Sequence, residues 1–483
     1  MNRPLMSRAL LALMLMIGFY ALALGIGLFL LLLPVFLTLW SHSFNIGLIK
    51  IYILSFIGGA IIIWSILPRF ERFQAPGLKL NLNEHLPLKR MLQDLSAKTG
   101  QKMPDEVYLI FENNAWVQEN LGFLGLFRKR RMAVGLPLMH MLTEQEFKAV
   151  LAHEYGHYHG GDTRLGAFIY QTRSALFRTV QNMSDNFIGK IFIAYGNMYL
   201  KLTHGISRAQ EYQADRFAAS HTSAAAMTAA LQKVGHLGGS FDHYWSSEVV
   251  PILNSGYKPP IMGGYYSYLE VPRIQDFWKN HYEQSNEEEH ALQTHPSMHK
   301  RIEALGKLDP TPEPPSEQFA LNLLRDPAQQ ELNLLKFLGG QEAFSKLQNI
   351  DWDTVGEQVW MPFWREASAK HRHLFVGQTL ENITLQLLDD TRRFRLFESM
   401  RHPSDPQGDG YPWMVVRFLF AVGLYDLGWK VEARPGASVQ FSKDEQVLCP
   451  LDDLTEMQNG ENRGLWLENL RKAGMEHAIL FKY

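Results

Sequence analysis

Two long apolar runs dominate the N-terminal part of the chain. The first, Ala9–Trp40, contains no charged residue, and the second, Ile46–Leu67, contains only Lys50, near its start. A helix needs about 20 apolar residues to cross the core of a bilayer, so each run is long enough to span a membrane. We therefore expect a transmembrane helical hairpin in residues 1–70, with spans at about 9–40 and 46–67.

The residues that flank these runs predict the orientation of the hairpin. Arginines precede the first run and Arg69, Arg72 and Lys79 follow the second, whereas the connection 41–45 contains neither Lys nor Arg. By the positive-inside rule, both ends of the hairpin and all that follows it face the cytoplasm. A cleaved signal peptide is the alternative for the first run. Its apolar stretch is about twice the usual signal length, and a second run follows at once.

Beyond the hairpin, the pattern changes between helical and extended segments. Helical periodicity begins near 87–98, and 106–111 and 132–139 read as short strands bounded by turn residues. Residues 187–202 are apolar but are interrupted by Lys190 and are short for a span. We interpret them as a buried or interfacial helix, with a third span as the alternative.

Two further helices are expected to begin at capping boxes. Thr143 and Glu146 have the required spacing and are followed by an apolar face, with Gly160-Gly161 as a natural stop. Ser207 and Gln210 repeat the spacing, so a second helix is expected to open at Ser207.

The rest of the chain divides at a proline-rich stretch. Residues 240–270 are rich in Gly, Tyr, Ser and Pro and read as a long surface segment, and 310–316 form a stiff Pro-rich linker. We expect a peptidase domain in 71–309 and an accessory domain in 317–483. In the latter, helical patterns cover parts of 317–347 and 370–400, and a hairpin turns at Pro435-Gly436.

Composition excludes several classes of function. The chain has 483 residues and a formal net charge of -2, so no global electrostatic case for nucleic-acid binding exists. Cys449 is the only cysteine, which excludes an intramolecular disulfide and a Cys-rich structural zinc site.

The candidate chemistry centres on His153-Glu154-Tyr155-Gly156-His157, in the helix that begins at Thr143. Histidines four apart on a helix share a face, so both imidazoles can reach a single metal ion. Zinc lowers the pKa of a bound water to about 7, and Glu154 can take the proton of the attacking water. Alone, the pattern also fits a helix with two surface histidines and a glutamate between them.

A zinc peptidase needs a third protein ligand. A histidine six residues after His157 would supply it in one class, but that position is Thr163. The alternative is a glutamate on a later helix, and Glu211 lies 54 residues beyond His157, four residues before Asp215. Glu211 can bind the metal, while Asp215 on the same face can accept a hydrogen bond from a ligand imidazole and fix its tautomer.

These motifs resemble those of the HtpX-like and CaaX-prenyl-protease family of integral membrane zinc metallopeptidases. The resemblance covers about 106 to 305. It rests on four ordered elements besides Asn114-Ala115: Glu146-x(4)-Leu151-Ala-His-Glu-Tyr-Gly-His157, Gly161-Asp162, Glu211-x-x-Ala-Asp215, and Thr294-His-Pro-Ser297 with Arg301-Ile302. Members of the HtpX type usually carry two further spans between the two ligand motifs, whereas this chain shows spans only at its start.

The resemblance implies a role for each matching residue. It assigns His153, His157 and Glu211 to a single zinc ion per chain and Glu154 to catalysis. It also implies that Asp215 orients a ligand, and that His295 donates a hydrogen bond to the oxyanion in the transition state. In addition, it places Arg301 in support of that segment or the substrate. Asn114 and Ala115 correspond to the edge strand that faces the substrate.

We therefore expect a mainly helical α+β fold: a zincin-type metallopeptidase domain behind a two-helix membrane hairpin, with a mixed α/β accessory domain at the C-terminus. The favoured function is a membrane-anchored zinc endopeptidase in membrane protein quality control, with its catalytic domain on the cytoplasmic side of a bacterial inner membrane. Its partners would be protein or peptide substrates and the lipid bilayer, with no nucleic acid. The alternatives are a processing protease for a specific precursor or lipidated substrate, and a non-catalytic membrane scaffold or chaperone.

Overall fold

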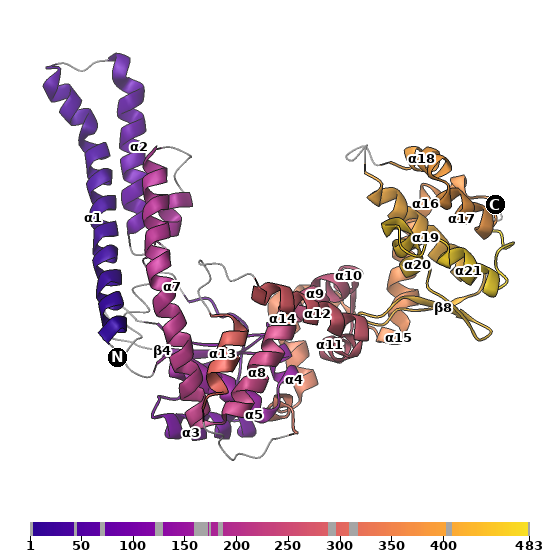
Figure 1. Cartoon of the computed structure of the whole chain (residues 1–483), viewed down its shortest axis with the longest axis horizontal. Helices are drawn as coiled ribbons and strands as arrows, with labels where there is room; N and C mark the ends of the chain where they lie inside the picture. Colours follow the sequence, from indigo (N-terminus) through magenta and orange to yellow (C-terminus); the bar gives the residue numbers. More distant parts are fainter. Residues whose placement is uncertain are drawn as a thin grey trace. The chain divides into compact units, whose positions relative to one another are not determined.

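The fold is seen in a computed structural model (Figure 1), which describes residues 3–42, 46–67, 73–120, 129–158, 172, 175–181, 187–287, 296–308, 317–401 and 408–481. The chain forms two compact units, Met1–His236 with His281–Pro327, and Leu237–Asn280 with Ala328–Tyr483. The expected Pro-rich linker 310–316 lies outside the described residues. The units also differ from the expected segments, because residues 237–280 group with the C-terminal part rather than with the peptidase part.

The N-terminal apolar runs form helices α1 (Arg3–Trp40) and α2 (Ile49–Ile66), which pack side by side (Figure 1). Within the described part of the chain, these are the two helices long and apolar enough to cross a membrane, over Leu10–Trp40 and Ile46–Ile66. Glycines allow the helices to approach closely. A Cβ atom at Gly59 would lie 2.6 Å from the carbonyl oxygen of Gly27. The two expected candidate spans are therefore present.

A four-stranded sheet supports the peptidase part. Its order is β1-β2-β4-β3, with β2 and β4 parallel and β3 antiparallel to β4, so β3 lies at the edge among the described strands. The strands are β1 (Leu78–Lys79), β2 (Glu106–Ile110), β3 (Ala115–Asn120) and β4 (Lys129–Gly135).

The expected strand at 132–139 is correct only as far as Gly135. The short helix α4 (Leu136–Met141) begins directly after it, with Pro137 in its first turn. Proline has no amide hydrogen and a φ near the helical value, so it favours the start of a helix over the continuation of a strand.

The helices of the peptidase part include the two that carry the metal-ligand motifs. They are α3 (Leu86–Thr99), α5 (Glu144–Gly156), α7 (Phe187–His221), α8 (Ala224–Leu237) and α13 (Met298–Leu305), whereas α12 (Pro272–Glu287) consists mostly of residues that group with the second unit. Helix α5 begins as predicted. Thr143 is its N-cap, and the Thr143 and Glu146 side chains form the reciprocal bonds of a capping box. Gly160-Gly161, the expected stop, lies outside the described residues.

The expected helix start at Ser207 is wrong, because α7 runs unbroken from Phe187 to His221. The Ser207 hydroxyl donates to the carbonyl of Thr203 one turn earlier, at 3.1 Å, as serines do within a helix. Since the backbone before Ser207 is already helical, no free amide requires a cap there.

The first half of α7 packs against the hairpin (Figure 1). The Tyr195 hydroxyl donates to the carbonyl of Leu15 at 2.5 Å, and the rings of Phe19 and Phe192 meet edge to face. Phe187 on the outer face is 78% exposed. The expectation of a buried or interfacial helix at 187–202 thus agrees with its buried inner face, and the same helix continues to the ligand motif.

Residues 240–270 do not form the expected surface segment. They fold as α9 (Ser240–Tyr244), a short π-helix (Trp245–Val249), α10 (Val250–Asn254), β5 (Tyr257–Lys258) and α11 (Ile261–Glu270). Tyr244, Tyr265 and Tyr268 are almost completely buried. The tyrosines that made the segment look polar form its core, since their rings are large and apolar and their hydroxyls find partners.

The remainder of this unit contains helices around a three-stranded sheet. The helices are α14 (Pro327–Lys346), α15 (Trp352–Val355), α16 (Met361–Ala369), α17 (Leu380–Leu388), α18 (Asp390–Glu398), α19 (Gly410–Asp426), α20 (Pro450–Asn459) and α21 (Leu465–Lys472). The strands are β6 (Gln348–Asn349), which pairs with β5, and β7 (Lys430–Glu432), β8 (Gln440–Lys443) and β9 (Gln446–Leu448). Strands β7 and β8 are antiparallel and flank Pro435-Gly436, as the predicted hairpin requires.

Candidate active site

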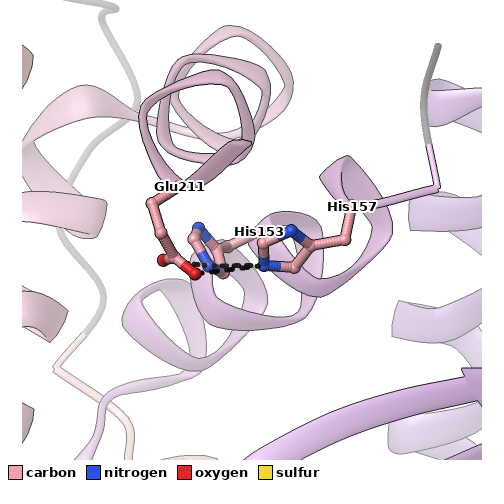
Figure 2. A group of neighbouring side chains, drawn as sticks. All are labelled: His153, His157 and Glu211. Carbon is pink, nitrogen blue, oxygen red and sulfur yellow. Dashed lines mark hydrogen bonds and ion pairs between the residues drawn. The ribbon is translucent and has the colours of Figure 1, made fainter. Parts of the chain in front are cut away.

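Helix α5 presents His153 and His157 on one face, one turn apart. Their Nε2 atoms lie 3.2 Å from each other (Figure 2). The glycine between them has a packing role, because a Cβ atom at Gly156 would lie 2.9 Å from the Cα of Ala214 in α7. Gly156 therefore allows α7 to approach α5 closely at the level of the two histidines.

Helix α7 contributes Glu211, whose carboxylate faces both imidazoles (Figure 2). Its Oε2 lies 3.5 Å from His153 Nε2, and its Oε1 lies 3.9 Å from His157 Nε2. One ligand atom from each of the three residues falls within 4.8 Å of the others. The structure thus brings together the three residues that the sequence predicts as metal ligands.

This cluster fits a zinc ion. A tetrahedral zinc with bonds of about 2.0–2.1 Å places neighbouring ligand atoms about 3.3 Å apart. Two of the observed separations, 3.2 and 3.5 Å, are close to this value, and the third, 3.9 Å, is longer. Two imidazole nitrogens and a carboxylate oxygen are also the donor set of one class of catalytic zinc site, which keeps a fourth position for water or substrate.

Asp215 sets the orientation of the first imidazole. Its Oδ1 lies 3.0 Å from Nδ1 of His153, so the hydrogen-bond network assigns a proton to Nδ1 and leaves the Nε2 lone pair directed at the cluster. Burial alone would raise the pKa of the Asp215 carboxyl, but hydrogen bonds from Arg301 and His153 lower it below its ordinary value. Asp215 therefore stays ionised beside the ring.

Arg301 connects the two acidic side chains of α7. Its Nη2 and Nε donate to Asp215 at 2.6 and 2.8 Å, and its Nη1 lies 3.3 Å from Oε2 of Glu211. All three side chains are buried. The sequence motif indicated that Arg301 belongs near the site, but its pairing with both carboxylates depends on the docking of α13 against α7.

The protonation equilibria of the histidines differ because their surroundings differ. Burial would lower the pKa of His153, but hydrogen bonds to Asp215 and Glu211 outweigh it and raise the pKa to about 9. For His157, burial and the nearby His153 lower the pKa to about 4. His157 is thus neutral at physiological pH and can bind a cation directly, whereas His153 must first lose a proton.

Glu154 lies beside the ligands and faces the edge strand. Its carboxyl accepts a hydrogen bond from the backbone of Val117 in β3. Burial raises the pKa of Glu154 to about 7, although the charge of His153 opposes the shift. A carboxyl that exchanges its proton near neutral pH is suited to general acid–base chemistry, and a bound divalent cation would lower its pKa.

The remaining predicted residues are placed differently. Ala115 begins the edge strand β3, but the carbonyl of Asn114 accepts from the amide of Gly135, so it faces β4 rather than the free edge. His295 lies outside the described residues. A contact that the sequence did not predict joins Tyr158 to Val117 (2.6 Å), because no local spacing relates α5 to β3.

The site lies in a part of the chain that is similar to known peptidases. The model of peptidase family M48 matches residues 83–309. Protease HtpX of Pseudomonas putida (strain W619) is 26% identical over 239 residues, which cover 45% of this chain and 70% of that protein. Protease HtpX of Pseudomonas fluorescens (strain Pf-5) is 29% identical over 168 residues, or 30% of this chain and 55% of that protein.

One solved structure was also matched, the crystal structure of S. mikatae Ste24p. It is 18% identical, the match covers 62% of this chain and 67% of that one, and the TM-score is 0.26. The family match and the HtpX relatives therefore carry the assignment. Helices able to cross a membrane, followed by a cluster of two histidines and a glutamate, define the class as a membrane metalloprotease. Residues 83–309 match peptidase family M48, and this part of the chain is similar to the HtpX proteases.

Proposed function

We propose that this protein is a zinc-dependent endopeptidase anchored in the membrane by α1 and α2. The observation that carries the proposal is the convergence of His153, His157 and Glu211 next to the carboxyl of Glu154. When bound there, zinc supplies a Lewis acid that lowers the pKa of water and polarises a carbonyl group. The residues of the chain supply proton transfer, orientation and a surface for the substrate.

Each of these tasks has a candidate residue. Glu154 takes the proton of the attacking water and passes it to the leaving amine. Asp215 orients His153 through Nδ1, and Arg301 positions Asp215 and Glu211. We also propose that His295 donates to the oxyanion, as the family resemblance implies, which is worth about 2.7–4 kcal/mol for such a donor.

The edge strand β3 indicates the form of the substrate. Glu154 contacts Val117 in this strand, so a peptide that adds to its free edge would pass beside the catalytic carboxyl. Only an extended segment can add to a strand edge, which favours unfolded or flexible polypeptides. Ala115, at the start of β3, belongs to the proposed substrate edge, and Asn114, whose carbonyl accepts from Gly135, directly precedes it.

The anchor and the flanking charges support a location and a role. We propose that the peptidase part lies on the cytoplasmic side of a bacterial inner membrane, since basic residues flank the hairpin and its short connection has none. Together with the preference for unfolded segments, this supports a role in the quality control of membrane proteins. We further propose that 71–309 is the catalytic part and that 317–483 selects substrates or binds a partner.

Removal and return of the metal tests the proposed activity. The detergent-purified protein is expected to cleave an unfolded protein such as casein, to lose cleavage on chelation, and to regain it when zinc is restored. Cleavage that survives complete removal of metal would contradict a zinc-dependent mechanism. Zinc-loaded protein that cleaves neither casein nor unfolded membrane proteins would contradict the proposed endopeptidase.

A further inference from the structure

The free edge of β3 is partly occupied by the side chains of Glu154 in α5 and of Tyr158 in the turn that follows α5. The Tyr158 hydroxyl donates to the carbonyl of Val117 at 2.6 Å, and the backbone amide of Glu119 hydrogen-bonds the same hydroxyl. In an antiparallel pair the backbone groups alternate in direction with a period of two residues. Val117 and Glu119 therefore both direct their backbone groups away from β4, toward the edge that a substrate strand would join.

The Tyr158 hydroxyl thus satisfies the two groups with which an added strand would pair at this point. The amide of Val117 is bonded to Glu154, so the catalytic carboxyl and the tyrosine lie next to each other along the same edge. Upstream of Val117, toward Ala115, Tyr158 makes no such bond. Main-chain pairing of a substrate would therefore stop where the hydroxyl of Tyr158 begins.

The ring of Tyr158 is held in place from behind. The guanidinium of Arg130 lies over it, 4.8 Å from the ring centre. Arg130 is itself buried, donates to the carbonyl of Lys102 at 2.8 Å, and lies 3.6 Å from the carboxylate of Glu119. A substrate that pairs beyond Val117 must displace a side chain that both the strand and a buried arginine stabilise.

We propose that Tyr158 is a specificity-determining residue that ends the pairing of substrate with β3 at Val117. This inference rests on the proposed endopeptidase function and specifies how far a substrate pairs with the edge strand. The substrate gains binding affinity from main-chain hydrogen bonds over a short stretch beside the scissile bond. Substrate residues that lie beyond Val117 of β3 add little to this affinity. Substrates are then selected by a short accessible segment rather than by a long extended one.

The test measures binding of peptides that cannot be cleaved, in which a methylene replaces the scissile carbonyl. One peptide covers only the short stretch. Two longer peptides carry three additional residues, one at its N-terminal end and the other at its C-terminal end. Affinity for the zinc-loaded full chain is measured in detergent by fluorescence anisotropy. Wild type is expected to bind short and extended peptides within about two-fold. Tyr158→Ala is expected to bind one extended peptide about ten-fold more tightly than the short one, and Tyr158→Phe to show a smaller gain, since each freed backbone group can bond the peptide.

Two controls isolate the strand edge. Tyr155→Phe removes a tyrosine hydroxyl three residues earlier, in α5, but that hydroxyl faces Ser96 at 3.3 Å, so peptide binding by this variant should match wild type. Methylation of the peptide nitrogen that would face Val117 should abolish the gain in Tyr158→Ala. The proposal would be overturned if wild type already bound an extended peptide ten-fold more tightly than the short one. It would also be overturned if neither variant at Tyr158 bound an extended peptide more tightly than the short one. Because the assay needs no turnover, a failure of the proposed proteolysis is seen separately, in the casein assay.

Discussion

At the scale of single residues, Asp215 links the metal ligands to the buried arginine. It holds Nδ1 of His153 at 3.0 Å and pairs with Arg301 through both oxygens. The Asp215→Asn variant keeps the shape but loses the charge that both partners need. We expect its zinc affinity to fall about 10–100-fold, measured by competition with a chromogenic chelator.

An acidic residue that contacts the same helix elsewhere provides the control. Asp94 pairs with Lys148 of α5 at 2.8 Å and contacts no predicted ligand. Asp94→Asn should therefore leave zinc affinity unchanged. Equal losses in both variants would show that α5 responds to any lost ion pair, and that Asp215 has no special role.

The raised pKa of His153, about 9, predicts how zinc affinity depends on pH. Below that pKa the metal-free ring carries an additional proton that zinc must displace, whereas His157, with a pKa near 4, carries none at neutral pH. Zinc affinity should consequently rise at least about ten-fold for each pH unit from 6 to 8, because zinc binding releases the proton of His153 and, below about pH 7, part of the proton of Glu154. Competition titrations at several pH values measure this slope, and a flat profile would contradict the protonation state assigned to His153.

At the scale of elements, the metal centre depends on the close packing of α5 against α7. A Cβ atom at Gly156 would lie 2.9 Å from the backbone of Ala214. We expect Gly156→Ala to destabilise the fold by about 1–3 kcal/mol and to weaken zinc binding, because Glu211 would move away from the histidines. Thermal unfolding and zinc content measure the two effects.

Gly196, a glycine in α7 with more space, is the matched control. The nearest atom to a Cβ at Gly196 is on Leu176, at 3.9 Å. Gly196→Ala should be neutral or stabilise the helix by up to about 1 kcal/mol. If both alanine variants behave alike, helix propensity rather than the approach of α5 and α7 determines the outcome.

The continuity of α7 makes a second prediction. One helix carries both the residues that pack on the hairpin and the ligand Glu211. Lys201 is exposed in the stretch between them, so Lys201→Pro would break the helix without removing a buried side chain, at a cost of about 3 kcal/mol. We expect this variant to lose zinc on gel filtration, while Lys201→Ala keeps it. Retention of zinc by the proline variant would show that the two halves of α7 act independently.

The elements also show why some features could be predicted from sequence and others could not. Thr143 and Glu146 cap α5 because the bonds of a capping box form within one turn. Ser207 and Gln210 have the same spacing but lie inside a helix, since the preceding residues are already helical. The pairs His153–His157 and Glu211–Asp215 are likewise local, so their shared faces could be predicted. The partners of Arg301 and Tyr158 come from distant elements, and no spacing encodes them.

At the scale of the whole molecule, residues 237–280 depend on the C-terminal part of the chain. The carboxylate of Glu331 in α14 accepts from the amides of Ile261 and Met262 at 2.7 and 2.9 Å, at the start of α11. Strand β5 pairs with β6. A chain truncated after Pro315, where the sequence places the domain boundary, would leave these groups without partners.

We therefore expect the truncated chain to bind hydrophobic dyes and to unfold at a lower temperature than the full chain. In the full chain, Glu331→Ala should cost about 1–3 kcal/mol, because two buried amides lose their acceptor. Glu342→Ala, at an exposed position beyond the kink of α14 at Gly340, should cost little. A truncated chain that unfolds at the temperature of the full chain without binding dye would contradict the division into these two units.

The measurement that tests the central claim most directly combines metal content with proteolysis in wild type and Glu154→Gln. This substitution keeps the size of the side chain and removes its capacity to take a proton. We predict about one zinc per chain in both proteins and cleavage of casein by wild type alone. If neither protein holds zinc, or if Glu154→Gln cleaves as fast as wild type, the proposed metal centre or the proposed base is wrong.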